Sequence, residues 1–330
     1  MRISFAGGGT DLPAYYESFG GMVVSTAINK YVYVIVTSSS HDSLQVSSSD
    51  YSTFLRHSGG DEIGEEGKLR YARAFLREFG IRTGYSIFMA SEMPPGTGLG
   101  SSSSLAVALV KALAAIGGEV PDKAEVAELA CHVEIDDLKM PIGKQDQYAS
   151  AFGSVNAIHF SAGEVRVEAL TISPRTRDWL SQSILLFFTE QSHDSAEILS
   201  EQRRRTAEHD PETLDALHEI KEHAAEARDA LLADAPDRLG DIMHRSWLAK
   251  KRIATGISNE RIDSAYAAAI KAGASGGKIS GAGGGGFLML ACDTPFRESV
   301  TVTMERHGLV RADFHLETSG ARILVNNAAA

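Results

Sequence analysis

The sequence predicts a protein of two domains, each of which mixes α-helices with β-strands. The chain has 330 residues, which is long enough to form two hydrophobic cores. Short segments rich in Val, Ile, Thr and Tyr occur beside longer apolar segments with helical spacing, so both types of element are present. The composition changes near residue 180, where the chain becomes largely helical. We therefore predict one domain over residues 1–180 and a second over residues 181–330.

The first half begins with a short predicted strand that enters the glycine turn Gly7–Asp11. Residues 22–37 are predicted to form one long strand or two, because they are rich in Val, Ile, Thr and Tyr. Residues 41–65 are predicted to form short strands and loops. The other predicted elements are a helix over 67–80, a strand over 85–91, a helix ending near 116, a helix starting near 121, and strands over 155–160 and 164–170.

The second half begins with a predicted strand over 183–189. The chain is then mostly helical from 194 to 272, with Pro211 and Pro236 near helix starts, where proline is tolerated. The remaining predicted elements are a strand over 287–292, a helix over 295–307 and strands over 310–324. The tail over 326–330 is expected to fray.

Composition and charge exclude several classes of protein. The chain is 43% hydrophobic and 23% charged, as is usual for a globular protein. Its net charge of −11 argues against nucleic acids and anionic membranes as partners. We find no segment as long as a membrane span and no signal-peptide pattern. Two cysteines in apolar segments do not form a disulfide framework, so a cytoplasmic location is expected.

The strongest functional signal is the segment MPPGTGLGSSSSL at residues 93–105. Its glycines and serines lie between a predicted strand and a predicted helix. Glycines allow a ligand to approach the backbone, and the first amides of a helix point towards an anion, most often phosphate. The serine hydroxyls add donors and a metal ligand. A flexible surface loop is the alternative, but such a loop would not run directly into a strongly apolar helix.

Two carboxylates could complete a site for phosphoryl transfer, which needs bound phosphates, a divalent metal and a group that receives the acceptor's proton. Asp146 follows a turn marked by glycine and proline, where a carboxylate could receive a hydroxyl proton. Glu134 lies on the preceding predicted helix, where it could meet a metal held by the serine loop. Magnesium prefers carboxylate and phosphate oxygens. A surface or capping role is the alternative for each carboxylate.

A second glycine-rich segment, GAGGGG at 281–286, matches the letters of a dinucleotide-binding fingerprint. That fingerprint requires glycines that lead into a helix, whereas here they lead into the apolar run FLMLA. An NAD-dependent oxidoreductase is therefore a weaker hypothesis that depends on this pattern alone. The chain contains no Walker G-K-[ST] and no G-x-S-x-G nucleophile elbow.

Taken together, these segments resemble the motifs of the GHMP kinases, the family of galactokinase, homoserine kinase, mevalonate kinase and phosphomevalonate kinase. RISFAGGGTD resembles the first motif, PPGTGLGSSSSL the second, KISGAGGGGF the third, and GKQDQYASAFG the segment with the catalytic aspartate. The match covers nearly the whole chain in the right order. It implies a two-domain α+β fold with an N-terminal domain like ribosomal protein S5 domain 2. The C-terminal domain would be ferredoxin-like with extra helices, and ATP and a sugar would bind between the two.

The resemblance also implies roles for individual residues. Asp146 would be the general base for the sugar hydroxyl, and Arg2 would keep that carboxylate ionised and stabilise the transferring charge. Ser102 and Glu134 match the positions that hold Mg²⁺. The residues that would bind ATP are Pro95, Gly96, Gly98, Leu99, Gly100, Ser101, Ser102, Ser103 and Ser104. Those that would bind or shape the substrate site are Gly9, Thr10, Asp11, Gly281, Ala282, Gly283 and Gly284.

Within the family, the motifs are most similar to the D-glycero-D-manno-heptose 7-phosphate kinases. This implies phosphorylation of the anomeric hydroxyl to the 1,7-bisphosphate, a step towards GDP-heptose for surface polysaccharide. The alternatives are a kinase for fucose, galactose or mevalonate, and a catalytically silent member that only binds nucleotide or sugar. The expected partner is a small-molecule sugar or sugar phosphate, and a homodimer stays open. The cations considered for a substrate phosphate are Lys30, Lys144, Lys250 and Lys251.

Overall fold

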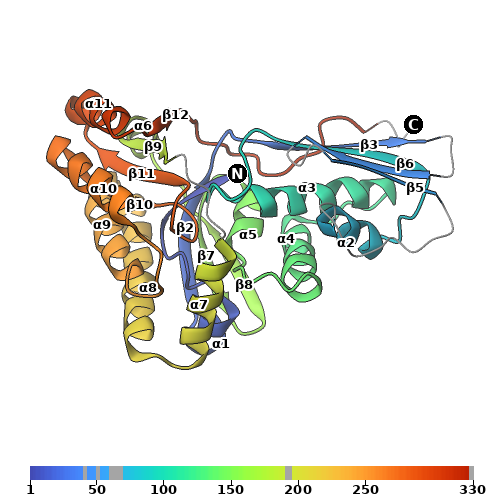
Figure 1. The fold of residues 1–330 in the computed structure, drawn as a ribbon, viewed down its shortest axis with the longest axis horizontal. Coiled ribbons are helices and arrows are strands. Elements are labelled where there is room, and N and C mark those ends of the chain that lie inside the picture. The colour runs from blue at the N-terminus through green and yellow to red at the C-terminus, as the bar shows by residue number, and fades with distance from the viewer. Residues whose placement is uncertain (40–42, 50–52, 59–69, 190–194, 327–330) are drawn as a thin grey trace.

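The computed structural model describes residues 1–39, 43–49, 53–58, 70–189 and 195–326. These residues form three four-stranded sheets with helices packed on them. Figure 1 shows the sheet β3-β6-β4-β5 at one end of an elongated molecule and the sheet β10-β11-β9-β12 at the other. The sheet β1-β2-β7-β8 lies between them. The predicted mixture of helices and sheets is confirmed, and no helix in the described ranges has the length and apolar character to cross a membrane.

The elements of the first half agree closely with the predicted segments. Residues 22–37 form two strands, not one, and the helix predicted from residue 121 begins with a capping box of Asp122 and Glu125. Parts of the predicted segments 41–65 and 67–80 lie outside the described residues. The elements are β1 (Arg2–Ala6), α1 (Pro13–Phe19), β2 (Gly21–Ala27), β3 (Val32–Ser38), β4 (Ser43–Ser48), β5 (Thr53–Ser58), α2 (Arg70–Glu78), β6 (Tyr85–Ser91), α3 (Ser101–Ile116), α4 (Lys123–Cys131), a π-helical turn (His132–Asp137), α5 (Gln145–Phe152), β7 (Val155–Ser161) and β8 (Glu164–Ala169).

The second half confirms the helical stretch but contains two elements that the sequence did not predict. The elements are α6 (Pro174–Ser183), β9 (Ile184–Phe188), α7 (Ser195–Ala207), α8 (Pro211–Leu232), α9 (Leu239–Lys250), α10 (Glu260–Ala272), β10 (Ala274–Ile279), β11 (Phe287–Cys292), α11 (Arg297–Arg306) and β12 (Val310–Ala312), with 3₁₀ turns at Pro236–Arg238 and Thr294–Phe296. The sequence did not predict α6 or β10. Strand β10 contains two glycines, and a Cβ on Gly276 would lie 1.9 Å from the Gly240 carbonyl oxygen. Close packing on α9 therefore determines this strand, and β-propensity does not.

The prediction of strands over 310–324 is wrong beyond β12. The following segment crosses to the first half of the chain, where the amide of Asn29 donates to the His315 carbonyl and the amide of Ser154 donates to the Glu317 carbonyl. Its only ladder contact among the described residues is an isolated bridge between Ile28 and Leu316. The part of the predicted frayed tail over 327–330 lies outside the described residues.

One hydrophobic core joins the two halves of the chain. Ile3 and Phe5 of β1 are fully buried in the same cluster as Leu231 of α8, Ile242 of α9 and Phe287 of β11. The turn that follows β1 and the glycine-rich turn that precedes β11 are therefore fixed relative to each other. The domain boundary near residue 180 stays a prediction.

Candidate active site

The second and third glycine-rich motifs are in direct contact. A Cβ on Gly98 would lie 2.3 Å from the Ser280 carbonyl oxygen, and a Cβ on Gly281 would lie 2.6 Å from the Gly98 Cα. Both glycines have positive φ angles, 79° and 76°. Only glycine satisfies both the close approach and the backbone conformation. The third motif continues into the strand β11 and not into a helix, which excludes the context of a dinucleotide-binding fingerprint.

Arg2 and Asp146 form a bidentate ion pair beside the second motif. The Arg2 Nε donates to Asp146 Oδ1 at 2.7 Å and Nη2 donates to Oδ2 at 2.8 Å, while Nη1 donates to the Gly98 carbonyl at 2.5 Å. Arg2 begins β1 and Asp146 lies in the first turn of α5, so elements far apart in sequence supply the pair. The Arg2 side chain is 3% exposed and the Asp146 side chain 22% exposed. The carboxylate therefore stays accessible to a ligand while the guanidinium holds it.

The second motif leads directly into α3. Gly100 precedes the helix with a left-handed conformation, and a Cβ there would lie 3.1 Å from Asp146 Oδ2. The hydroxyls of Ser102 and Ser103 each donate to Glu134 Oε1 at 3.3 Å. Ser104 instead donates to the Gly100 carbonyl at 2.8 Å, inside the helix. Two of the four serines that were expected to bind ATP therefore point towards Glu134, the carboxylate that was expected to bind the metal.

The remaining predicted ATP-loop residues lie in different environments. Pro95 and Gly96 are exposed, whereas Leu99 is buried in the core that joins the two halves. The Leu99 carbonyl accepts a hydrogen bond from the Arg2 amide at 3.0 Å, so this residue anchors the loop to β1. The hydroxyl of Ser101 donates to the Pro94 carbonyl at 3.5 Å, which closes the turn.

Glu134 is fully buried on the π-helical turn. Its carboxylate also accepts hydrogen bonds from the Tyr71 hydroxyl at 2.8 Å and the Gln147 amide at 2.6 Å. Burial raises the pKa of Glu134 to about 7, although the hydrogen bonds from Tyr71, Gln147 and Ser103 oppose this shift. Among the described residues, four groups donate to this carboxylate, and all four are neutral. A hydroxyl oxygen and a carboxylate with no cationic partner in this part of the chain are ligands that suit Mg²⁺, so Ser102 and Glu134 fit a magnesium site.

The turn of the first motif is organised around Asp11. The buried carboxylate accepts hydrogen bonds from the Gly9 amide at 2.9 Å and from the amide and side chain of Gln145 at 3.2 and 3.1 Å. Burial raises the pKa of Asp11. The hydroxyl of Thr10 donates to the Gly7 carbonyl at 2.8 Å, so this side chain stabilises the turn from inside. The turn is therefore tied to the start of α5, where Asp146 lies.

The four lysines considered for a substrate phosphate lie in different places. Lys250 is buried and its ammonium donates to the Gly281 carbonyl; burial lowers the pKa of Lys250 to about 8. Lys144 pairs with Glu128 at 3.0 Å and Lys251 pairs with Asp263 at 3.2 Å. Lys30 accepts a hydrogen bond from the terminal amine of Met1 through its backbone carbonyl. Of the four, Lys250 contacts the third motif.

Sequence reasoning did not single out Lys278, which lies on β10 and is 3% exposed. Its ammonium lies 4.0 Å from the position that a Cβ on Gly8 would take. Lys278 is the first residue of the third motif, KISGAGGGGF, whose other residues carry no charge. A lysine inside a glycine-rich, otherwise uncharged segment is the signal that could have found it.

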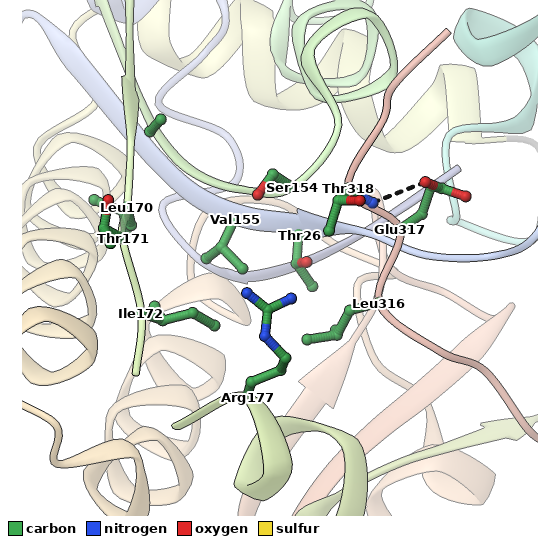
Figure 2. A pocket seen from close by; sticks show the side chains of 11 residues that line it. Thr26, Ser154, Val155, Leu170, Thr171, Ile172, Arg177, Leu316, Glu317 and Thr318 are labelled. Atoms are coloured by element: carbon green, nitrogen blue, oxygen red, sulfur yellow. Dashed lines mark hydrogen bonds between the residues drawn. The ribbon is translucent and has the colours of Figure 1, made fainter. Parts of the chain in front are cut away.

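Most of the predicted site residues do not line either of two pockets in the described part of the chain. Figure 2 shows the smaller one, about 230 Å³, where Arg177 of α6 points in between Ile172 and Leu316. None of its lining residues belongs to the predicted site. The larger one, about 830 Å³, is lined by residues that include Leu12 and Lys144, which flank the first motif and α5.

Comparison with known families identifies two matching regions. The profile described as "GHMP kinases N terminal domain" matches residues 68–154, and the profile "GHMP kinases C terminal" matches residues 227–300. These ranges contain the second motif, Glu134, Asp146 and the third motif.

Among curated proteins, the chain is 28% identical to a D-glycero-alpha-D-manno-heptose 7-phosphate kinase of Campylobacter jejuni, over 98% of this chain and 96% of that protein. It is 27% identical to a bifunctional fucokinase/GDP-fucose pyrophosphorylase of Arabidopsis thaliana, over 93% of this chain but 31% of that longer protein.

Among solved structures, a D-glycero-D-manno-heptose 1-phosphate kinase from Bacteroides thetaiotaomicron superposes with a TM-score of 0.80 at 24% identity, over 98% of each chain. The galactokinase of Lactococcus lactis, solved with galactose, superposes with a TM-score of 0.75 at 19% identity, over 97% of this chain and 92% of that one. At these identities the two structures show the shared fold.

Proposed function

The chain belongs to the GHMP kinases, and from this premise we propose that it transfers the terminal phosphoryl group of ATP to the anomeric hydroxyl of a sugar. The proposed acceptor is D-glycero-D-manno-heptose 7-phosphate, and the proposed product is the 1,7-bisphosphate, a step towards GDP-heptose. The observation that carries the proposal is the bidentate Arg2–Asp146 pair, which lies against the second glycine motif. This ion pair supports the assignment of Asp146 as a base that lies next to the loop proposed to bind phosphate.

The proposed reaction assigns the proton and the leaving group as follows. The Asp146 carboxylate accepts the proton of the anomeric hydroxyl as that oxygen attacks the terminal phosphorus of ATP. The bond between that phosphorus and the bridging oxygen breaks, and ADP leaves. An anomeric hydroxyl is more acidic than an ordinary alcohol, so a carboxylate suffices as base. Arg2 orients the carboxylate through two hydrogen bonds and adds positive charge beside the transferring group.

The nucleotide side of the proposed site relies on neutral donors. The backbone amides of residues 96–102, at the start of α3, would hold the phosphates of ATP. Ser102 and Glu134 would hold Mg²⁺, and Tyr71, Ser103 and Gln147 fix the orientation of the Glu134 carboxylate. A bound Mg²⁺ would neutralise charge on the phosphates.

Two observations support a sugar as the acceptor. One relative matched over nearly the full length of both chains is a heptose 7-phosphate kinase, and a fucokinase matches over a similar share of this chain. In addition, Asp11 presents a buried carboxylate next to α5, where it could accept hydrogen bonds from sugar hydroxyls. The fucokinase match makes a kinase for free fucose the second candidate.

A substrate panel tests the proposal. Heptose 7-phosphate, free fucose, galactose and mevalonate are each offered with Mg·ATP, and ADP release is followed by a coupled assay. We expect turnover of the phosphorylated heptose with the new phosphate on the anomeric oxygen, which ³¹P NMR identifies. Turnover of free fucose without turnover of phosphorylated heptose would replace the proposed acceptor.

A further inference from the structure

Two buried lysines lie between the turns of the first and third motifs. Lys250 ends α9 and is 5% exposed, and Lys278 lies on β10 and is 3% exposed. Lysine is rarely buried without a partner, because its charge loses hydration. The ammonium of Lys250 donates to the Gly281 carbonyl, which satisfies one of its three hydrogens. The ammonium of Lys278 has no hydrogen bond or ion pair within the described ranges of the chain.

The charges around the two lysines do not balance. Arg2, Lys250 and Lys278 lie near Asp11 and Asp146, which gives three positive and two negative charges, or +1, when all are ionised. Arg2 and Asp146 are committed to each other in a bidentate pair. Two ammonium groups therefore face one remaining carboxylate, Asp11, in a chain whose net charge is −11. When all five groups are ionised, this cluster is therefore positive in a protein that is acidic as a whole.

Burial makes this arrangement costly without a ligand. Desolvation lowers the pKa of Lys250 to about 8 and lowers the pKa of Lys278 well below its ordinary value. The neighbouring charges of Lys250 and Arg2 lower the pKa of Lys278 further, while Asp11 acts in the opposite direction. An anion between the two ammonium groups would favour the charged form of both.

The local packing leaves unpaired polar groups beside the lysines. The Gln145 amide nitrogen and the Lys278 ammonium lie 3.6 and 4.0 Å from the position of a Cβ on Gly8, so the ends of both side chains lie against this turn. Gln145 Oε1 and the hydroxyl of Ser280 are both buried and have no partner in the described part of the chain. Ser280 is 2% exposed and directly precedes Gly281, the residue that Lys250 contacts. A hydroxyl and two ammonium groups are donors that suit phosphate oxygens.

We infer that Lys250 and Lys278 bind a phosphate group carried by the acceptor substrate. This inference rests on the proposed function, because it assumes a kinase whose acceptor is itself phosphorylated. The Lys278 ammonium lies on the acceptor side, since it is 4.0 Å from the position of a Cβ on Gly8, which belongs to the turn organised around Asp11. The terminal phosphate of ATP has the same chemistry, so the experiment must separate the two sources.

Equilibrium binding measured by calorimetry tests the inference without turnover. Lys278→Met removes the charge and nearly keeps the side-chain volume. Lys251→Met is the matched control, because this neighbouring lysine pairs with Asp263 at the surface. The ligands are inorganic phosphate, heptose 7-phosphate, galactose 6-phosphate and a non-hydrolysable ATP analogue with Mg²⁺. We expect Lys278→Met to weaken binding of the phosphate and the sugar phosphates about ten- to a hundredfold, as loss of a charge-assisted hydrogen bond does, and Lys251→Met to change nothing.

The ligands for which the Lys278→Met variant loses affinity decide whether the inference holds. A loss confined to the ATP analogue would overturn the inference and assign the lysines to the transferring phosphate. Unchanged affinity for every ligand would also overturn it. If the substrate panel rejects heptose 7-phosphate while Lys278→Met still weakens galactose 6-phosphate, the proposed function fails and the phosphate subsite stands. Lys278→Arg, which restores the charge, should recover part of the lost affinity, and a thermal unfolding curve of each variant verifies that it is folded.

Discussion

The two sides of the proposed site hold charge in different ways. On the nucleotide side, the start of α3 offers amides and hydroxyls, and Glu134 is surrounded by four neutral donors. On the acceptor side, the ionisable side chains of Asp11, Lys250 and Lys278 are buried between two glycine turns. Neutral donors suit a ligand that brings its own metal, whereas buried charges select for a ligand of complementary charge. This difference predicts that the residues on the acceptor side determine which acceptor the protein binds.

Replacement of the base should have the largest effect and should leave the nucleotide side intact. Asp146→Asn keeps the shape of the side chain but cannot accept a proton, so kcat should fall by about 10²- to 10⁴-fold. Steady-state kinetics measures the loss, and calorimetry should give nearly unchanged affinity for the ATP analogue. Asp136→Asn, on the exposed face of the π-helical turn, is the control. An unchanged kcat would remove Asp146 from the role of base.

The contact between the second and third motifs couples the two sides and can be tested with two glycines. Gly98 and Gly118 have nearly equal φ angles, 79° and 77°, but a Cβ meets the Ser280 carbonyl oxygen at 2.3 Å in the first case and nothing within 4 Å in the second. Gly118→Ala should cost about 1 kcal/mol of unfolding free energy, from the backbone conformation alone. Gly98→Ala should cost about 2–4 kcal/mol, because overpacking adds to that strain.

Urea unfolding of both glycine variants measures the difference. The Gly98→Ala variant should also bind the ATP analogue and the acceptor more weakly, because the displaced turn belongs to both sides. Equal destabilisation by the two substitutions would show that the contact between the motifs relaxes without cost.

Removal of the buried charge at Lys250 should give the smallest effect, with a pH dependence that identifies its cause. The pKa of this lysine falls from 10.5 in the unfolded chain to about 8 in the folded one. Below pH 8 both states are protonated and the burial cost is complete. Between pH 8 and 10.5 the folded state releases its proton first, so the unfolded state binds more protons and the stability of the unmodified protein rises with pH.

Lys250→Met should therefore stabilise the protein at pH 7 by about 1–3 kcal/mol, since one pKa unit corresponds to about 1.4 kcal/mol. This advantage should shrink to nothing as the pH approaches 10.5. Urea midpoints measured at several pH values provide the test, with Lys251→Met as the exposed counterpart. An advantage that does not depend on pH would indicate a packing effect.

Much of the fold and part of the site could be predicted from local sequence. Segments with a single clear period, such as α3 and β6, have the predicted bounds. Helix α6 was not predicted, although Ser173 and Pro174 mark its start in the local sequence. Strand β10 could not be predicted, because close packing on α9 determines it against contrary propensity. The strands predicted over 310–324 are wrong beyond β12, since the backbone hydrogen bonds of the following segment are made with the first half of the chain.

The sequence by itself determined the loop that is proposed to bind phosphate, because glycine spacing and a helix start are local properties that need no partner. It also determined the order of the motifs, which points to Asp146 and Arg2. Only the tertiary structure decided that Lys278 and Lys250 share one buried site with Asp11. The physical reason is that desolvation and charge balance depend on groups hundreds of residues apart in sequence, which the core shared by the two halves brings near one another.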